Sequence, residues 1–391
     1  MGGAGLRFLL GRYRGRQLGP VLVFVVLSAA GCDVVGSDAA GNVPAGSETG
    51  GGPQSEGDDG PDSAGGAAGN DAGGATPTQG SLHFEAMGWR HEVTDSGCRS
   101  SPRVANLVVH GTVPTNVVVT GHSGCSIPTT VFVDHLVGDA FEPLVEGCYG
   151  VVWAASPSLV FAGSCGGGGI FRIEDGQSSE EQLPAAASAK IGAIWGFDAT
   201  DILAVGNEGL ILHRDAQQWS VEESGTQVGL SSVWGSGSEA FAVGEGGTVL
   251  HRVAGVWSSM ESGTEIYLTD VWGTGPEDVY AVGGSSDAPG HIILHYDGVR
   301  WSVVNTGDAR KSSLRGVWGT SPSDVYVVGF YDAEADEVPA EIFHWDGRAW
   351  TEISTPFATP DTSFSDIWCA QKDDCWIVGT DDALYHMTRS P

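Results

Sequence analysis

The sequence predicts an all-β protein, a seven-bladed β-propeller of four-stranded antiparallel blades. Three observations lead to this fold: a motif of about 40 residues recurs along the chain, each copy divides into four short apolar strands, and the copies fill residues 81–391. Four strands per repeat of this length are typical of a propeller blade. Because a single blade cannot bury its own apolar faces, we expect the copies to stack side by side in a ring.

The first two strands of each copy carry its most regular positions. The clearest copy covers residues 268–310 and begins with Val271-Trp272-Gly273. The aromatic residue of this motif marks each copy, at intervals of 38 to 50 residues: His110, Trp153, Trp195, Trp234, Trp272, Trp318 and Trp368. The second strand of each copy ends at a glycine: Gly121, Gly163, Gly206, Gly244, Gly283, Gly329 and Gly379. Seven markers with seven glycines predict seven blades.

Other polar and aromatic positions repeat as well. A short polar side chain follows the marker by six residues, where it is expected to close a turn onto its own backbone, at Asn116, Asp201, Asp278, Asp324 and Asp374. A third-strand histidine stands six residues before a tryptophan in five segments, at His83, His213, His251, His295 and His344, and His386 shares the register. Equivalent positions on different blades are too far apart to share one ion. We therefore expect half-buried histidines with hydrogen-bond partners, and no metal site.

The two ends of the repeat array are expected to complete one another. The seventh copy stops before its fourth-strand tryptophan, while residues 82–93 look like a third and a fourth strand, with Trp89 six residues after His83. We predict that the N-terminal strand around Trp89 closes the ring, which removes an exposed sheet edge. Residues 82–84 would then duplicate the third strand at 384–386, and the sequence leaves the place of this surplus open.

The N-terminus predicts export. Four arginines precede an apolar run at residues 21–30 that is too short to span a bilayer, and the run ends in Ala29-Ala30-Gly31-Cys32, a bacterial lipobox pattern. We interpret residues 1–31 as a lipoprotein signal peptide and Cys32 as the lipid anchor. The alternative is a plain secretory signal with an incidental cysteine. The predicted location is the envelope of a Gram-negative-type bacterium, with the outer membrane or cell surface favoured.

Composition separates a tether from the repeats and limits the partners. Residues 32–80 consist mainly of Gly, Ala, Ser and Asp and cannot repay the entropy of folding, which predicts a disordered tether. The chain has 18 basic and 49 acidic residues, a net charge of −31. This charge disfavours nucleic acid and anionic headgroups, so we expect membrane contact through the lipid anchor only. We also expect a monomeric propeller, and acidity that serves solubility alone is the simpler explanation of the charge.

Six further cysteines predict three disulfides, because an even number is typical of exported proteins. In an antiparallel blade the start of the first strand lies beside the end of the second. This geometry predicts the pairs Cys98–Cys125 and Cys148–Cys165. A third pair, Cys369–Cys375, is expected across the first turn of the last copy.

The repeats resemble a family of bacterial exported propellers with Val-Trp-Gly repeats, similar in style to Asp-box and kelch-like propellers. The resemblance covers residues 82–391. It depends on Val-Trp-Gly at 233–235, 271–273 and 317–319, and on Asp-Gly-x-x-Trp at 297–301 and 346–350. A true Asp box has Ser or Thr before the Asp and one more residue before the Gly, so sialidase-type activity is not implied. The resemblance implies a binding or scaffold role.

Departures from the repeat indicate where a ligand would bind. The loops between second and third strands are long in the fifth, sixth and first copies, and we expect them to form a wall on one face. Near the axis of that face the first strands carry a candidate polar site, formed by Asp270, Arg315 and Asp366. The alternative is that these residues form an ion-pair network between blades. The long loop of the sixth copy adds candidates that could equally form a solvated loop: Tyr331, Asp332, Glu334 and Asp336.

The expected function is a membrane-anchored binding or scaffold module that presents this face to a glycan, peptide or envelope protein. The competing hypothesis is a glycan hydrolase or lyase that uses Asp270 or Asp366 as its acid or base, which requires carboxylates facing one another across a pocket. The sequence contains no metalloprotease motif, nucleophile elbow, phosphate-cradling loop or Cys-x-x-Cys pair, so motifs give catalysis no support. We expect no cofactor.

Overall fold

The computed structural model describes most of one unit of the chain, Ala72–Pro391. The described residues are 82–89, 104–123, 130–138, 140–165, 167–185, 187, 189–216, 218–284, 291–306, 312–331, 340–355, 363–380 and 383–389. They form strands joined by turns, with two short 3₁₀ segments, η1 (Asn207–Gly209) and η2 (Glu245–Gly247). Among them no helix has the length and apolar character needed to cross a membrane. The predicted signal peptide and tether (1–80), with Cys32, lie outside the described residues.

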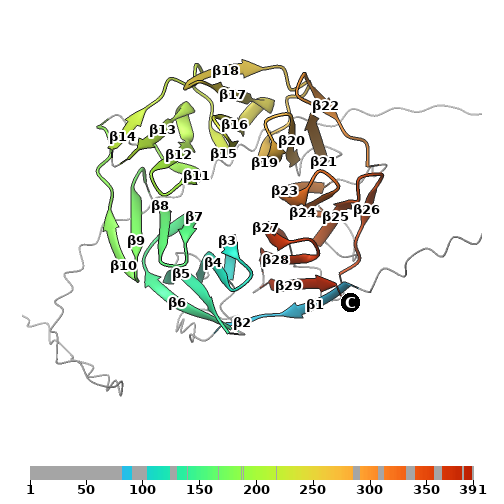
Figure 1. Ribbon diagram of the computed structural model, residues 1–391, viewed down its shortest axis with the longest axis horizontal. Coiled ribbons are helices and arrows are strands. Elements are labelled where there is room, and N and C mark those ends of the chain that lie inside the picture. Colours follow the sequence, from blue (N-terminus) through green and yellow to red (C-terminus); the bar gives the residue numbers. More distant parts are fainter. Residues whose placement is uncertain are drawn as a thin grey trace, which may run out of the picture. The chain divides into compact units, whose positions relative to one another are not determined.

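Successive strands pair antiparallel in groups of four, and the groups follow one another around a ring (Figure 1). Blades 1 to 3 are β3 (Val104–Val113), β4 (Asn116–Ser123), β5 (Thr130–Val137) and β6 (Ala140–Glu146); β7 (Tyr149–Ser156), β8 (Leu159–Ser164), β9 (Ile170–Glu174) and β10 (Gln177–Glu180); and β11 (Ile191–Asp198), β12 (Asp201–Gly206), β13 (Ile211–Asp215) and β14 (Gln218–Val221). The predicted class, a propeller of four-stranded antiparallel sheets, is confirmed.

The remaining blades continue the same order. Blades 4 and 5 are β15 (Leu230–Ser236), β16 (Glu239–Gly244), β17 (Val249–Val253) and β18 (Val256–Met260); and β19 (Leu268–Gly275), β20 (Asp278–Gly284), β21 (His291–Tyr296) and β22 (Trp301–Val303). Blades 6 and 7 are β23 (Ser312–Ser321), β24 (Asp324–Tyr331), β25 (Ala340–Trp345) and β26 (Trp350–Glu352); and β27 (Phe364–Gln371), β28 (Asp374–Gly379), β29 (Leu384–Arg389) and β1 (Leu82–Ala86). A bridge between Gly284 and Ser313 joins blades 5 and 6 into one sheet.

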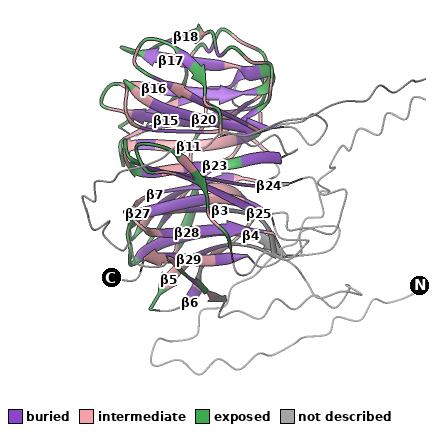
Figure 2. Cartoon of the chain, turned by 90° about the vertical axis from the view of Figure 1, so that its right-hand side faces the viewer, coloured by how far each residue is buried: buried purple, intermediate pink, exposed green. Residues whose placement is uncertain are grey.

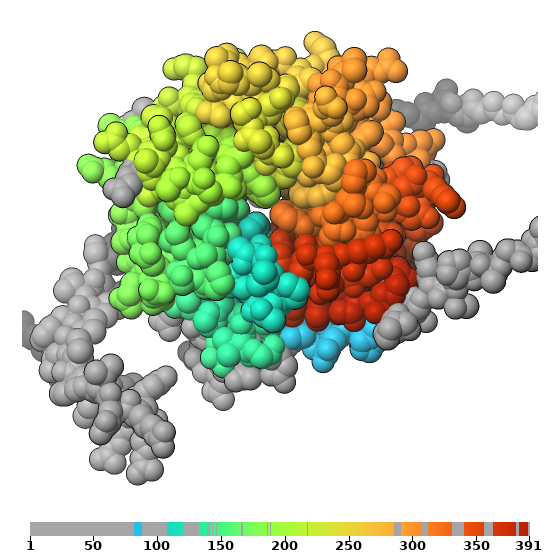
Figure 3. All heavy atoms as spheres, in the orientation of Figure 1, coloured from blue at the N-terminus to red at the C-terminus, as the bar shows by residue number. Residues whose placement is uncertain are grey.

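The N-terminal strand closes the ring, but not at the predicted place. β1 pairs antiparallel with β29 from Leu82–Arg389 to Ala86–Tyr385 and is the outermost strand of blade 7. Figure 3 shows it packed against the C-terminal blade. Trp89 belongs instead to β2 (Gly88–Trp89), a fifth strand that pairs in parallel with β6 of blade 1. The predicted closure by Trp89 is therefore wrong, and residues 82–84 are not a surplus third strand.

Pairing and packing explain why β1 takes the closing place. It offers five consecutive residues to the open edge of β29, whereas β2 offers only two to its neighbour. Its central side chain, Phe84, is buried and packs in an apolar cluster with Tyr326, Ile377 and Met387. The spacing from His83 to Trp89 matches that of the repeat, but Phe84 is the residue of β1 that is buried in the blade.

Apolar side chains between the blades form the core, and buried residues line the inner strands while exposed residues gather at turns and outer strands (Figure 2). At or near the end of five second strands, a glycine lets the backbone that leads into the first strand of the same blade pass close by: Gly206, Gly244, Gly283, Gly329 and Gly379. At Gly206 a Cβ would collide with the carbonyl oxygen of Lys190, and at Gly379 with that of Ser363. These glycines are required by close backbone approach.

The acids that follow the first strands serve a purpose other than the predicted one. Instead of closing a turn onto its own backbone, Asp278 accepts a hydrogen bond from the Thr274 hydroxyl and lies 2.7 Å from Nε2 of His295, which stacks on Tyr280. The same acid–histidine pair recurs on four other blades: Asp201–His213, Glu239–His251, Asp324–His344 and Asp374–His386. Five of the six predicted histidines thus have hydrogen-bond partners within their own blades, whereas His83 is exposed on β1 and is not a third-strand residue.

Two glutamates at the ends of fourth strands clamp neighbouring blades together. Glu222, just after β14, accepts hydrogen bonds from Arg252 (2.6 Å) and from the Trp257 indole (2.7 Å) of blade 4, and it lies 3.1 Å from His213. Glu181 makes the equivalent contacts with Arg214 and Trp219 of blade 3. Burial would raise the pKa of Glu222, but the hydrogen bonds from His213, Arg252 and Trp257 outweigh it and lower that pKa to about 2.

Disulfides join Cys148 to Cys165 and Cys369 to Cys375, with Cα–Cα distances of 5.3 and 3.9 Å. Both are local pairs that the blade geometry leads one to expect. The first ties the start of blade 2 to the end of its second strand, and the second crosses the turn between β27 and β28. The third expected pair, Cys98–Cys125, lies outside the described residues.

Replacing Phe84 by Ala should lower the free energy of unfolding by about 3 kcal/mol, because it removes the only large buried side chain that β1 brings to blade 7. Urea unfolding of the full-length chain measures this. The matched control is His83→Ala on the exposed face of the same strand, with an expected change within about 0.5 kcal/mol. Equal stability of the two variants would show that β1 does not close the ring.

Replacing Glu222 by Gln should destabilise the protein by about 2 to 4 kcal/mol at pH 7, since Arg252 and His213 lose their charged partner. A carboxylate whose pKa falls from 4.5 to about 2 on folding contributes stability that is complete above pH 4.5. This contribution is lost as the pH falls towards 2. The difference in the free energy of unfolding between the wild type and Glu222→Gln should therefore shrink over that range. The exposed neighbour Glu223, changed to Gln, is the control. A pH-independent difference would contradict the assignment.

Candidate functional site

The aromatic markers of the repeat meet at the axis of the ring. His110 lies 6.3 Å from Trp195 and 5.8 Å from Trp318, measured between ring centroids, and Trp195 lies 6.1 Å from Trp318. These residues come from blades 1, 3 and 6, which are not neighbours around the ring. Side chains from opposite sides are therefore in contact, and they block the axis at this level. We call the seven markers the aromatic floor: His110, Trp153, Trp195, Trp234, Trp272, Trp318 and Trp368.

Each aromatic ring of the floor reaches the next blade. There it contacts the residue that directly follows the marker of that next blade. At four junctions this residue is a glycine whose Cβ, if present, would collide with the preceding ring: Gly111 with Trp368, Gly196 with Trp153, Gly273 with Trp234 and Gly319 with Trp272. Hydrogen bonds link the other three described junctions: Trp195 Nε1 to Gly235 O (3.0 Å), Trp318 Nε1 to Cys369 O (3.1 Å) and Ala154 N to His110 Nδ1 (3.2 Å).

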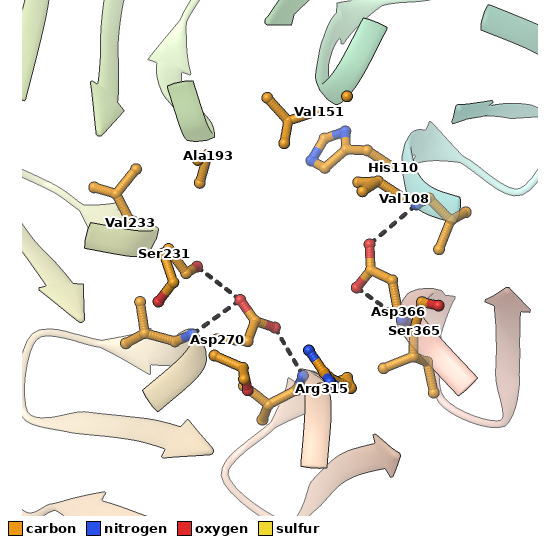
Figure 4. A pocket seen from close by; sticks show the side chains of 18 of the residues that line it. Val108, His110, Val151, Ala193, Ser231, Val233, Asp270, Arg315, Ser365 and Asp366 are labelled. Atoms are coloured by element: carbon orange, nitrogen blue, oxygen red, sulfur yellow. Dashed lines mark hydrogen bonds between the residues drawn. The ribbon is translucent and has the colours of Figure 1, made fainter. Parts of the chain in front are cut away.

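A cup of about 600 Å³ opens above the floor, on the face where the first strands begin. The residue two positions before each marker lines its wall in six of the blades, so one position of the repeat sets the chemistry of the cup: Val108, Val151, Ala193, Ser232, Asp270 and Asp366. Figure 4 shows the result. Blades 1 to 3 present an apolar wall, and blades 4 to 7 present a polar one.

The structure brings the three predicted polar residues together in this cup (Figure 4). Asp270 accepts hydrogen bonds from the Ser232 hydroxyl (2.7 Å) and from the backbone N–H groups of Val271 (2.9 Å) and Val317 (2.8 Å). Asp366 accepts from the N–H groups of Ile367 (2.8 Å) and Val109 (3.0 Å). Each carboxylate thus joins its own blade to the next one through a backbone N–H.

Both carboxylates flank the same residue of blade 6. Asp270 bonds to the N–H of Val317, next to Gly316, and a Cβ on Gly316 would lie 3.1 Å from Asp366 Oδ1. Burial raises the pKa of Asp270 to about 6, against the opposing effect of its hydrogen bonds. Burial and then repulsion from Asp270 raise the pKa of Asp366 well above its usual range. Asp270 and Asp366 therefore form an interacting acid pair.

The cation of the candidate site does not neutralise this pair. Arg315 is exposed, and its guanidinium lies 5.2 Å from the centre of the Phe330 ring. Among the described residues no ion pair joins Arg315 to Asp270 or Asp366. The alternative of an ion-pair network between blades is thus replaced by carboxylate–backbone bonds. His110 does not supply a charge either, because burial lowers its pKa to about 4.

The other candidate residues remain apart from this geometry. Tyr331 ends β24, and its side chain is not described. Asp332, Glu334 and Asp336 lie outside the described residues, as do the long loops of blades 1, 5 and 6. Within the described ranges, no group of three or more His, Cys, Asp or Glu side chains could hold a metal ion.

Sequence reasoning assigned the tryptophan markers to blade architecture and missed that they also form the floor of a cup. The available signal for this floor was that a small residue directly follows each marker in the sequence. It also missed the mouth of the cup, which is lined by Lys190, Tyr267 and Phe330. These residues lie in or beside the links between blades, where the repeat gives no guide.

The ring and its blocked axial cup define the class of protein, a β-propeller. No family model and no curated protein matches the chain. YCF48 bound to D1 peptide is similar in structure, with a TM-score of 0.57 and 13% identity over 79% of this chain and 96% of that one. The WD40 propeller of Doa1 has a TM-score of 0.55 and 11% identity, over 73% and 92%. The extracellular domain of BT4673 from B. thetaiotaomicron has 0.52 and 10%, over 80% and 40%. At these identities the likeness shows the fold alone.

Replacing Gly273 by Ala should destabilise the ring by about 1 to 3 kcal/mol, because the new methyl group would meet the Trp234 ring and the carbonyl oxygen of Asp278. Gly275→Ala on the same strand is the control, since no atom lies within 4 Å of its Cβ position. Thermal unfolding monitored by tryptophan fluorescence compares the two. A Gly273 variant as stable as the Gly275 variant would refute the contact between Trp234 and its neighbouring blade.

Proposed function

We propose that this chain is an exported binding module whose axial cup receives a segment of a peptide or protein partner. The observation that carries the proposal is the cup itself, which is concave, blocked below by aromatic rings and divided into an apolar and a polar wall. Its volume lies within the range of about 300 to 1,000 Å³ that is usual for ligand sites. Rigid strands position all the side chains of its wall, so little order would be lost on binding.

A propeller of similar fold, YCF48, has been solved bound to a D1 peptide, and this supports a peptide as the ligand class. A glycan remains the second candidate partner, for which the aromatic floor would supply stacking surfaces. We further propose that residues 1–31 are a signal peptide and that Cys32 is a lipid anchor in the cell envelope. Residues 33–80 would then be a tether that carries the cup away from the membrane surface.

The hydrolase hypothesis receives less support from the geometry. Every carboxylate oxygen of Asp270 and Asp366 accepts at least one backbone N–H. Those bonds favour the ionised form of each carboxylate, whereas a general acid must hold a proton. A binding function makes use of the same residues without requiring a free general acid.

Replacing Ala193 by Phe should abolish ligand binding, because the new ring fills the cup from its apolar wall. The test is a random peptide display library panned on the full-length chain, followed by affinity measurements on the enriched peptides. We expect Ala193→Phe to weaken them by at least about tenfold. The control is Val299→Phe at a turn that is 81% exposed. Peptides that bind both variants like the wild type would place the binding surface elsewhere and refute the proposal.

A further inference from the structure

We infer that the acid pair Asp270–Asp366 receives a cationic group, the ammonium or guanidinium of a lysine or arginine side chain in the bound segment. This inference rests on the proposed function and names the chemistry that the cup selects. It follows from three properties of the site: a charge without a counter-ion, an aromatic surface beside it and the position of the cup's own cations.

The first property is uncompensated charge. Two carboxylates flank Gly316 at close range, and the part of the chain that the structure describes gives neither of them an ion pair. Backbone N–H groups and one hydroxyl are their partners, and these supply partial charges only. Like charges held together in a desolvated site repel strongly unless a proton or a cation intervenes. A ligand cation would relieve this repulsion.

The second property is the surface beside the acids. Trp195 and Trp318 are half-buried members of the floor that line the cup, and both already donate their indole N–H to a backbone carbonyl. What they present to a ligand is therefore ring surface rather than a donor. Indole faces attract cations and also cover the methylene stem of a lysine or arginine. The floor and the acid pair thus suit the same side chain.

The third property is the placement of the other charges. The titratable groups that face the cup are His110, Lys190, Tyr267, Asp270, Arg315 and Asp366. Lys190 and Arg315 are exposed, so water and salt screen their repulsion of an incoming cation. The carboxylates are half-buried, so water screens their attraction less. An anionic ligand would meet the two carboxylates with no cation paired to them.

The pH dependence follows from the same geometry. Because burial raises the pKa values of Asp270, to about 6, and of Asp366, the pair holds protons at low pH. A cation binds the ionised pair, so affinity should rise as the pH increases through about 6, with release of protons. His110 stays neutral over this range, because burial lowers its pKa to about 4. The profile therefore reports the acid pair.

The test uses the best enriched peptide from the library on the full-length chain. We expect a lysine or arginine that, when replaced by norleucine or citrulline, costs at least about tenfold in affinity at pH 7.5. The same replacement should cost less than about twofold against Asp366→Asn, since the pair has lost a charge. Arg315→Gln should tighten binding by about two- to fivefold, because it removes a competing cation. The control Asp346→Asn changes an exposed turn acid whose backbone bonds an asparagine can also accept.

Two results would overturn the inference, and they differ in what they leave standing. In the first result, Ala193→Phe weakens the binding of the enriched peptides, but the peptides keep their affinity when each of their basic residues is replaced. The cup then binds peptides by other chemistry, and only this inference fails. If Ala193→Phe has no effect, the proposed function fails with it. Should Asp366→Asn fold poorly, the peptide replacements and the pH profile of the wild-type chain decide, and affinity that is constant from pH 5 to 8 overturns the inference.

Discussion

The ring depends on one constraint at the junctions between blades. Each aromatic marker contacts the small residue that follows the marker of the next blade. A ring of this kind has little room at its axis, and the indole groups enter it only because glycine, or in two places alanine or cysteine, leaves space. Aromatic pairs contribute about 0.5 to 1.5 kcal/mol each beyond the area that they bury, and such pairs join neighbouring markers at four junctions: His110–Trp153, His110–Trp368, Trp195–Trp234 and Trp272–Trp318. Together with the contacts to the small residues, they fix the spacing of the blades.

The same contact creates the site. Once the markers have filled the axis, the residues two positions before them can only line a cup that opens to one face. Placing two carboxylates there has a cost, since the raised pKa of Asp270 alone corresponds to about 2 to 3 kcal/mol of lost stability above pH 6. This cost already includes the opposing effect of the backbone N–H groups, through which the acids join blades. A ligand cation would offset the cost.

The regular positions could be predicted, because they are fixed by contacts within a blade or with an identical neighbour. The propeller class, the hydrogen-bonded third-strand histidines and the local pairing of Cys148 with Cys165 are of this kind. The predictions were wrong where a residue had the sequence spacing of the repeat but took another place in the fold. Trp89 has the repeat's spacing but stands on β2, while Phe84 has the buried position on the closing strand. Asp278 has a turn position, but His295 attracts its side chain across the blade.

By itself the sequence determined the repeat, the strand order within each blade and the presence of Asp270, Arg315 and Asp366 at the starts of first strands, because these depend on local periodicity. Only the tertiary structure decided that Asp270 and Asp366 flank one glycine, that Arg315 lies against Phe330 and pairs with neither of these two acids, and that the markers block the axis. The acid pair and the blocked axis are relations between different blades, far apart in the chain, and the contact of Arg315 with Phe330 joins two strands of blade 6. Distances across a closed ring depend on how every blade packs on the next, and no single repeat contains that information.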